Sequence, residues 1–485
     1  MSYLLGIDLG SSSVKVSLLD AESGQCVGSA SYPEQEAPIK ALQPGWAEQR
    51  PDDWWEYFKH ALAKLSTLNS QLSTVRAIGI SYQMHGLVCL DNNLMPLRDA
   101  IIWCDSRGVP YGQQAFEKLG EAYCLGHLLN SPANFTASKL AWVKDNEPEL
   151  FDKIKYIMLP GDYLALRLSG SPATTACGLS EMMLYDFTTG EPSQTLMDYF
   201  GFPHEILPPL VPTFGVQATL SATAAAELGL SAGTPITYRA GDQPNNALSL
   251  GVMNVGEVAA TAGTSGVVYG IVETGERKAE SGRRINTFLH VNGKLGLMHC
   301  MNGCGIANAW MRRMAGPSLS YDEINRLAAT APVGCEGLSL IPFGNGAERV
   351  LENRNLGCSL HGIDFNQHSQ PQLLRAAQEG VAFAFYYGME LMGHTSTIRA
   401  GKANMFLSPL FREILSTTSG AAIEFYDTDG AAGAARGSGL GAGIYASPEE
   451  AFTSLQRIDT FVPNLTLTAA YREAYGRWKE LLNKQ

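Results

Sequence analysis

LLGIDLGSSSVKVSLLD, residues 4–20, is the segment around which the rest of the chain is interpreted. Apolar residues precede a small polar turn, and apolar residues alternate with polar ones after it, which predicts a β-hairpin. The turn contains a glycine for close backbone approach, three hydroxyl groups, free amides that suit an anion, and the carboxylate of Asp8, which suits a hydrated cation. These groups fit a polyphosphate and its metal, although such a turn on its own is more often an ordinary hairpin.

A second segment repeats this pattern. Residues 258–271, VAATAGTSGVVYGI, align with the first hairpin at a constant separation, so that Thr261 corresponds to Asp8, Gly263 to Gly10, Ser265 to Ser12 and Val267 to Val14. A repeat in register is much stronger support for phosphate binding than either turn alone, and it indicates two related halves of the chain.

The length also predicts two domains. At 485 residues, the chain exceeds the size at which one hydrophobic core usually keeps growing. The boundary is expected just before the second hairpin, and we predict domains at residues 1–244 and 245–485. With 45% apolar and 17% charged residues, the composition is that of a globular protein and not of a disordered one.

The net charge indicates which partners can be expected, and the cysteines indicate the redox environment of the protein. The net charge of −12 lacks a basic cluster, which argues against nucleic acid or an anionic membrane but not against a nucleotide, whose charge a metal largely offsets. The nine cysteines are scattered without a CxxC pair, which favours buried thiols in a reducing cytosol over disulfides or zinc. With no signal peptide and no apolar run long enough to cross a membrane, we expect a cytoplasmic protein that acts on small molecules.

Two polar segments follow predicted strands in the first half. Residues 75–81 and 87–91 are strand-like, so Gln83-Met84-His85-Gly86 lies on the connection between them, where binding groups are usually presented. Trp103-Cys104-Asp105-Ser106-Arg107 follows soon after. Imidazole, carboxylate and guanidinium groups together can bracket several hydroxyls, but a carboxylate–guanidinium pair that serves only the structure remains an open alternative.

A third candidate lies at the end of a later strand. Residues 235–240 predict a strand that leads into Gly241-Asp242-Gln243-Pro244. Proline at the first turn places the carboxylate of Asp242 at the N-terminus of a helix. Binding and catalytic groups collect at such strand ends in α/β sheets, which makes Asp242 a candidate catalytic residue.

Other nucleotide motifs are excluded. Residues 437–442 formally fit GxGxxA, but no strand runs directly into these glycines and no acidic residue follows in the required βαβ context. A closely packed helix of small residues within 429–443 is the better interpretation. The sequence contains no GxxxxGK[ST] either, which excludes a P-loop ATPase.

The ordered motifs GIDLGSSSVK, QMHG, WCDSR, GDQPNNA and AGTSG resemble the FGGY family of carbohydrate kinases, and the match is closest to its xylulokinases. The resemblance covers nearly the whole chain. It implies an α/β fold of two actin-like, ribonuclease H-like domains with a cleft between them, sugar on the side of residues 1–244, and ATP with Mg²⁺ on the side of residues 245–485. It also implies that a homodimer is possible, since similar kinases often form one.

The resemblance also assigns site residues. Asp242 matches the catalytic base, Met84 and His85 the substrate pair, Asp8 the first phosphate turn and Thr264 the second. The sugar contacts it implies are Met84, His85, Trp103, Asp105, Asp242 and Gln243. The ATP and phosphate contacts it implies are Asp8, Gly10, Ser11, Ser12, Ser13, Gly263, Thr264, Ser265, Gly401 and Asn404. Mg²⁺ is expected near Asp8 and Asp242, through ATP and water, and a substrate or metal ligand that transfers no proton remains the alternative role of Asp242.

The chain departs from the family pattern in three places. Gln243 follows the catalytic Asp where many xylulokinases have Asn, and Asp162-Tyr163 lacks the lysine that often precedes it. The GGGA adenine signature is replaced by RAGKAN, residues 399–404, so the adenosine contacts cannot be carried over directly.

Two classes of function follow from these patterns. The first is a kinase that transfers phosphate from ATP to a ketose, with D-xylulose preferred and sedoheptulose or ribulose as alternatives. The second is an actin-like switching ATPase without a small-molecule acceptor. The QMHG and WCDSR segments favour the kinase, because a switch has no evident need for a polar sugar pocket.

Overall fold

The computed structural model describes residues 2–68, 72–275, 281–393, 395–401 and 404–485, which fall into two compact units. Unit 1 comprises the chain up to Gly251 together with Phe288–Lys294 and Thr428–Leu455, and unit 2 comprises Val252–Thr287, Leu295–Asp427 and Gln456–Gln485. The division at residues 244 and 245 stays a prediction, and the units differ from it chiefly because Thr428–Leu455 belongs to unit 1.

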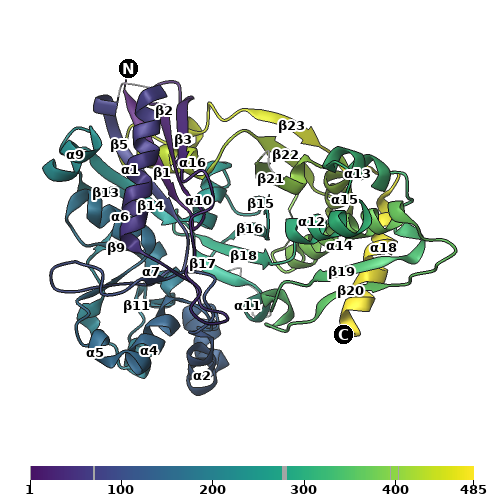
Figure 1. The fold of residues 1–485 in the computed structure, drawn as a ribbon, viewed down its shortest axis with the longest axis horizontal. Helices are drawn as coiled ribbons and strands as arrows, with labels where there is room; N and C mark the ends of the chain where they lie inside the picture. Colours follow the sequence, from purple (N-terminus) through teal and green to yellow (C-terminus); the bar gives the residue numbers. More distant parts are fainter. Residues whose placement is uncertain (1, 69–71, 276–280, 394, 402–403) are drawn as a thin grey trace. The chain divides into compact units, whose positions relative to one another are not determined.

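A six-stranded sheet forms the centre of unit 1, in the order β13-β14-β5-β1-β2-β3 (Figure 1). The strands are β1 (Tyr3–Leu9), β2 (Val14–Asp20), β3 (Cys26–Tyr32), β5 (Val75–Tyr82), β13 (Phe214–Thr219) and β14 (Pro235–Gly241). β1, β5 and β14 are parallel, so their C-terminal ends lie at one edge of the sheet. β1 and β2 form the predicted antiparallel hairpin, with Leu9 opposite Val14.

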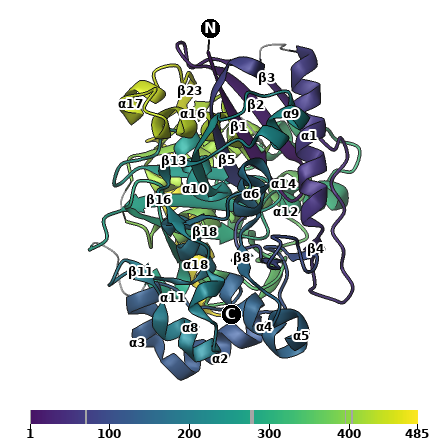
Figure 2. The ribbon, with the colours of Figure 1, turned by 90° about the vertical axis from the view of Figure 1, so that its left-hand side faces the viewer.

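Helices cover both faces of this sheet. α1 (Pro51–Leu68) packs on β2 and β3, whereas α16 (Gly430–Gly441) packs on β1 and β5 (Figure 2). The close approach of α16 requires glycine in the strands, because a Cβ atom at Gly6 would lie 1.8 Å from the Ala431 carbonyl oxygen and one at Gly79 2.0 Å from that of Ala434. This small-residue helix confirms the interpretation of residues 429–443.

The remaining elements of unit 1 are mostly short. The helices include α4 (Thr136–Asn146), α6 (Pro160–Ser169), α7 (Ala176–Met182) and α10 (Asp242–Ser249), which carry or support the site. The others are β4 (Glu48–Gln49), η1 (Leu72–Thr74), β6 (Val88–Leu90), β7 (Ala100–Ile101), α2 (Val109–Leu119), α3 (Glu121–Tyr123), η2 (Cys124–Leu128), α5 (Pro148–Phe151), β8 (Tyr156–Met158), β9 (Thr174–Thr175), β10 (Tyr185–Asp186), β11 (Glu191–Pro192), α8 (Gln194–Phe200), η3 (His204–Ile206), β12 (Leu210–Val211), α9 (Ala222–Leu228) and α17 (Pro448–Ala451).

A seven-stranded sheet organises unit 2, in the order β17-β18-β16-β15-β21-β22-β23. The strands are β15 (Val258–Ala262), β16 (Gly266–Val272), β17 (Asn286–Leu289), β18 (Leu295–Met301), β21 (Thr397–Gly401), β22 (Ala422–Tyr426) and β23 (Arg457–Phe461). β15 and β16 form the second predicted hairpin, with Ala262 opposite Gly266. Both predicted hairpins are therefore confirmed, and each belongs to the central sheet of its unit.

Helices pack against this sheet around a large apolar core. They are α11 (Ser281–Arg284), α12 (Gly305–Ala315), α13 (Tyr321–Ala328), α14 (Gln370–Met389), α15 (Pro409–Ser419) and α18 (Thr468–Asn483). The other elements are β19 (Ser339–Phe343), β20 (Gly357–His361), η4 (Cys335–Gly337), η5 (Arg349–Leu351) and η6 (Asn404–Leu407). α14 lies at the centre of the core, where Val381 and Phe385 are buried. Within the described ranges, no helix is both long enough and apolar enough to cross a lipid bilayer.

Candidate functional site

The first phosphate turn, residues 8–13, joins β1 to β2 and is fixed by contacts to its carbonyl groups. The side-chain amide of Gln49 donates to the Ser11 carbonyl oxygen at 2.7 Å, and the Ala37 backbone N–H donates to that of Ser12 at 2.7 Å. Gly10 N–H closes the turn on the Ser13 carbonyl oxygen at 3.0 Å. Since these bonds occupy carbonyl groups, they leave the hydroxyl group of exposed Ser12 for a ligand.

Asp8 is the last residue but one of β1 and lies near a second carboxylate, Asp429, that the sequence did not single out. Burial raises the pKa of Asp8, the Ser81 hydroxyl opposes this shift, and the negative charge of Asp429 adds to it. Asp429 caps α16 by accepting from Ala432 N–H at 2.9 Å, and it pairs with Lys15 at 2.7 Å. Its capping pattern is visible in the sequence, but its position beside Asp8 is not.

Asp242 begins α10, directly after β14, as predicted. Burial, followed by the nearby charge of Asp8, raises its pKa to about 7, although bonding to Gln243 opposes this. The structure thus brings Asp8 and Asp242 together at the edge where the parallel strands end. A carboxylic acid that titrates near neutrality is suited to accept a proton at physiological pH.

The two carboxylates also fit a hydrated magnesium ion. Both are hard oxygen donors, and a cation between them would offset the negative charge of Asp8 that, after burial, raises the pKa of Asp242. Among the residues that the structure describes, no group of three or more His, Cys, Asp or Glu side chains is arranged to hold a metal by itself. Mg²⁺ would therefore complete its shell with water and phosphate oxygens, as it usually does.

Met84 lies beside the start of α10, and His85 follows Met84 in the chain. A Cβ atom at Gly241 would lie 2.5 Å from Met84 Cγ, so Met84 packs against the residue that precedes Asp242. The His85 ring packs against Phe135 and Phe288, with centroids 4.8 and 5.2 Å away. Burial, followed by the nearby charge of Lys139, lowers the pKa of His85 to about 3, which leaves the imidazole neutral.

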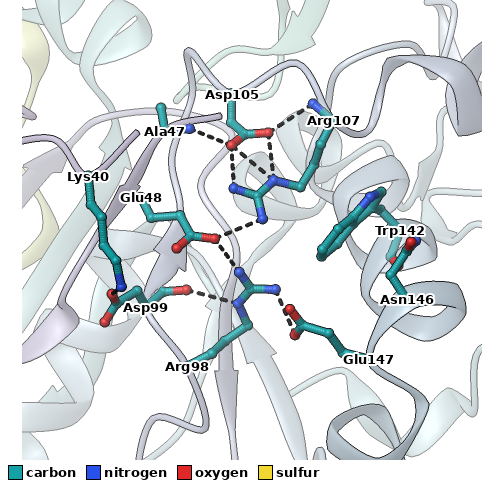
Figure 3. Close-up of polar contacts among 10 residues, drawn as sticks. All are labelled: Lys40, Ala47, Glu48, Arg98, Asp99, Asp105, Arg107, Trp142, Asn146 and Glu147. Carbon is teal, nitrogen blue, oxygen red and sulfur yellow. Dashed lines mark hydrogen bonds and ion pairs between the residues drawn. The ribbon is translucent and has the colours of Figure 1, made fainter. Parts of the chain in front are cut away.

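The WCDSR segment divides into an exposed part and a buried part. Trp103 is 45% exposed, and its indole N–H donates to the Ser11 hydroxyl at 3.3 Å, which connects a predicted sugar contact with the phosphate turn. Asp105 is 0% exposed and accepts from Ala47 N–H and from the Arg107 side chain, as Figure 3 shows. Direct contact between Asp105 and a sugar is therefore not available in this conformation, and its contacts fit the structural alternative.

Arg107 belongs to a wider buried network. Its guanidinium contacts Glu48 at 2.7 Å, and Glu48 also contacts Arg98 (Figure 3). The same guanidinium lies over the ring of Trp46 at 3.8 Å. Arg98 in turn pairs with Glu147 at 2.8 Å. These contacts fix the WCDSR loop against the loop that carries Trp46.

The second phosphate turn, Gly263-Thr264-Ser265, is held against the N-terminus of α12. Gly305 N–H donates to the Gly263 carbonyl oxygen at 2.8 Å, and a Cβ atom at Gly305 would lie 2.4 Å from that oxygen. The Asn404 side chain approaches the same turn, because its Nδ2 atom would lie 3.3 Å from a Cβ atom at Gly263.

The segment that replaces the adenine signature is only partly described. Gly401 ends β21, residues 402–403 lie outside the described residues, and Asn404 follows in a left-handed conformation with φ of 53°. Arg399 contacts Glu257 and Glu424, both at 3.4 Å. The structure therefore places Asn404 at the second phosphate turn and Arg399 in ion pairs of its own sheet.

Comparisons with known proteins identify the family of this chain. Two family models match, described as the N-terminal and C-terminal domains of the FGGY family of carbohydrate kinases, over residues 3–249 and 258–415. The xylulose kinase of Bacillus subtilis is 30% identical, over 99% of this chain and 97% of its own length. The L-xylulose/3-keto-L-gulonate kinase of Escherichia coli is also 30% identical, over 99% and 96%.

A solved structure extends the likeness to the fold. The crystal structure of a "xyloylose kinase" from Brucella ovis superposes with a TM-score of 0.91 at 27% identity and covers 99% of both chains. The expected α/β fold of two actin-like domains is thereby confirmed. The chain belongs to the FGGY family of carbohydrate kinases and is itself a carbohydrate kinase.

Proposed function

We propose that this enzyme phosphorylates a ketose with ATP, and that the ketose is D-xylulose, which becomes D-xylulose 5-phosphate. The observation that carries the proposal is the position of Asp242, whose pKa is raised to about 7 beside Asp8 and which follows Gly241 where that residue meets Met84 and Glu181, the residue bonded to His85. A base, a phosphate turn and a hydroxyl-binding histidine within one unit are what phosphoryl transfer to a sugar requires. The xylulose kinases among the relatives support the choice of sugar.

Each candidate residue then has a role. Asp242 accepts the proton of the terminal sugar hydroxyl as its oxygen attacks the γ-phosphorus, and the bond from that phosphorus to the bridging oxygen of ADP breaks. We assign Met84, His85, Trp103 and Gln243 to the sugar, and Asp105 to positioning the loop that carries Trp103. We assign two turns to the phosphates of ATP. The first consists of Gly10, Ser11, Ser12 and Ser13, and the second of Gly263, Thr264 and Ser265. We assign Gly401 and Asn404 to the nucleotide side. Bound Mg²⁺ would neutralise phosphate charge near Asp8 and Asp242.

One alternative has support of its own. The relative from Escherichia coli named for L-xylulose and 3-keto-L-gulonate is as similar as the xylulose kinase of Bacillus subtilis, so another ketose is that alternative. The actin-like switching ATPase, the second class expected from the sequence, has no such support from the relatives. We also propose that the enzyme works in the cytoplasm, where ATP is available, and possible assembly as a homodimer stays a prediction.

Asp242→Asn tests the proposal. The substitution removes the base and a charge but nearly keeps the shape, so sugar-dependent turnover should fall by roughly 10² or more while the folded structure remains. ADP formation with and without D-xylulose measures turnover, and circular dichroism measures folding. Exposed Glu191→Gln is the matched control. Turnover near the wild-type rate would remove Asp242 from the role of base.

A further inference from the structure

His85 is held at three points in an unusual backbone conformation. Its φ angle is 61°, in the left-handed region that costs energy for a residue with a side chain. Its backbone N–H donates to Glu181 Oε2 at 3.0 Å, and its carbonyl oxygen accepts from Lys139 Nζ at 2.8 Å. Its ring Nδ1 lies 3.0 Å from the Glu181 carbonyl oxygen. Residue 181 therefore contacts both the backbone and the ring of His85.

These contacts fix which ring nitrogen carries the proton. A backbone carbonyl oxygen only accepts, so Nδ1 must be the donor, and in a neutral imidazole Nε2 then keeps a lone pair. The ring is neutral because burial and Lys139 lower its pKa to about 3. Throughout the part of the chain that the structure describes, Nε2 has no hydrogen-bond partner, so it is left to accept from a ligand.

Glu181 is a buried carboxylate that lies between His85 and the residue before Asp242. It is 2% exposed, and its Oε1 accepts from the Tyr82 hydroxyl at 2.7 Å. The same oxygen lies 3.1 Å from where a Cβ atom of Gly241 would be, directly before Asp242. Burial raises the pKa of Glu181 well above its usual range. A buried carboxylate is costly, and within the described ranges no Lys or Arg side chain bonds to it, so its partners point to a role at His85 and not to an ion pair.

We propose that Glu181, together with Lys139, is a positioning residue that holds His85 with Nε2 as a hydrogen-bond acceptor, and that the sugar must donate a hydroxyl proton to it. The proposal rests on the proposed function, since it places the sugar at His85. It predicts selection for hydroxyl donors: a substrate analogue with fluorine in place of the contacting hydroxyl can accept but cannot donate, and should bind weakly.

The tautomer is tested without any substrate. In protein labelled with ¹⁵N-histidine, the two ring nitrogens of His85 are assigned by the signals that disappear in His85→Gln. We expect Nδ1 at the shift of a protonated nitrogen and Nε2 at that of an unprotonated one. The reverse assignment would overturn the proposal, even if the protein proved not to phosphorylate sugars, which separates this test from that of the proposed function.

Kinetics then test the two positioning residues. Glu181→Ala and Lys139→Met should each raise KM for D-xylulose by roughly tenfold, with a smaller change in kcat, because each removes one hydrogen bond that orients a binding group. Glu181→Gln should restore most of the affinity, since its amide oxygen can accept from His85 N–H while its NH₂ donates to Tyr82. Exposed Glu191→Ala is the control.

The two variants also carry the spectroscopic signature. Both variants keep the Glu181 carbonyl oxygen but lose a bond to the His85 backbone, so the ring should be held less firmly against that oxygen and the His85 nitrogens should shift toward a mixture of tautomers. If either variant is folded and keeps both the wild-type KM and the wild-type tautomer, the proposal is wrong. Should Glu181→Ala fail to fold, Lys139→Met and the wild-type spectrum still decide the question.

Discussion

The ionisation of Asp242 should make the rate of the reaction depend on pH. Because its pKa is raised to about 7 by burial and by the nearby charge of Asp8, half of the base is protonated near neutrality. Only the ionised form accepts a proton, so kcat/KM for the sugar should rise with pH up to about 7 and level off above it. The profile is measured from about pH 5 to about pH 9 with saturating ATP. A profile that is flat from pH 6 to pH 8 would contradict the assignment of Asp242 as the base.

Single residues show where sequence reasoning ends. Asp8, Met84, His85 and Asp242 were predicted because each lies within a motif or at a strand end, and the structure brings all four into unit 1. Glu181 carries no such signal. It lies within an apolar helical segment, and its meaning comes only from contacts with residues about a hundred positions away.

A single substitution can test how closely α16 packs on the six-stranded sheet of unit 1. Gly6→Ala would place a Cβ atom 1.8 Å from a backbone oxygen of α16, and neither backbone can move without disturbing the other. We expect destabilisation by about 3 kcal/mol or more, seen as a lower urea midpoint of the first unfolding transition. In contrast, Gly126→Ala meets no atom within 4 Å and serves as the control. Equal midpoints for the two variants would refute this account of α16.

The elements themselves were largely predictable, because hydrophobic periodicity and turn residues are local. Both hairpins, the strand before Asp242 and the helix of small residues were all expected and are found. What the sequence could not supply is the return of Thr428–Leu455 to unit 1, since this depends on backbone contacts between α16 and strands about four hundred positions earlier. No local sequence pattern indicates which sheet a helix will pack against.

For the whole molecule, the reaction class is better defined than the sugar. Family models and full-length relatives agree on a carbohydrate kinase, whereas relatives of equal similarity are named for different ketoses. Substrate choice depends on a few side chains around one pocket, and 30% identity leaves most of them free to change. Gln243, which we propose as a sugar contact, would be one such position.

Direct product analysis tests the central claim. The purified enzyme is incubated with ATP, Mg²⁺ and each of D-xylulose, L-xylulose, ribulose, sedoheptulose and glycerol, and ³¹P NMR identifies the phosphorylated product while ADP is measured in parallel. We predict D-xylulose 5-phosphate as the preferred product, with one ADP formed for each sugar phosphate and only weak ATP hydrolysis without sugar. Release of ADP at the same rate with every sugar and with none, and without any sugar phosphate, would contradict the account and favour the switching ATPase.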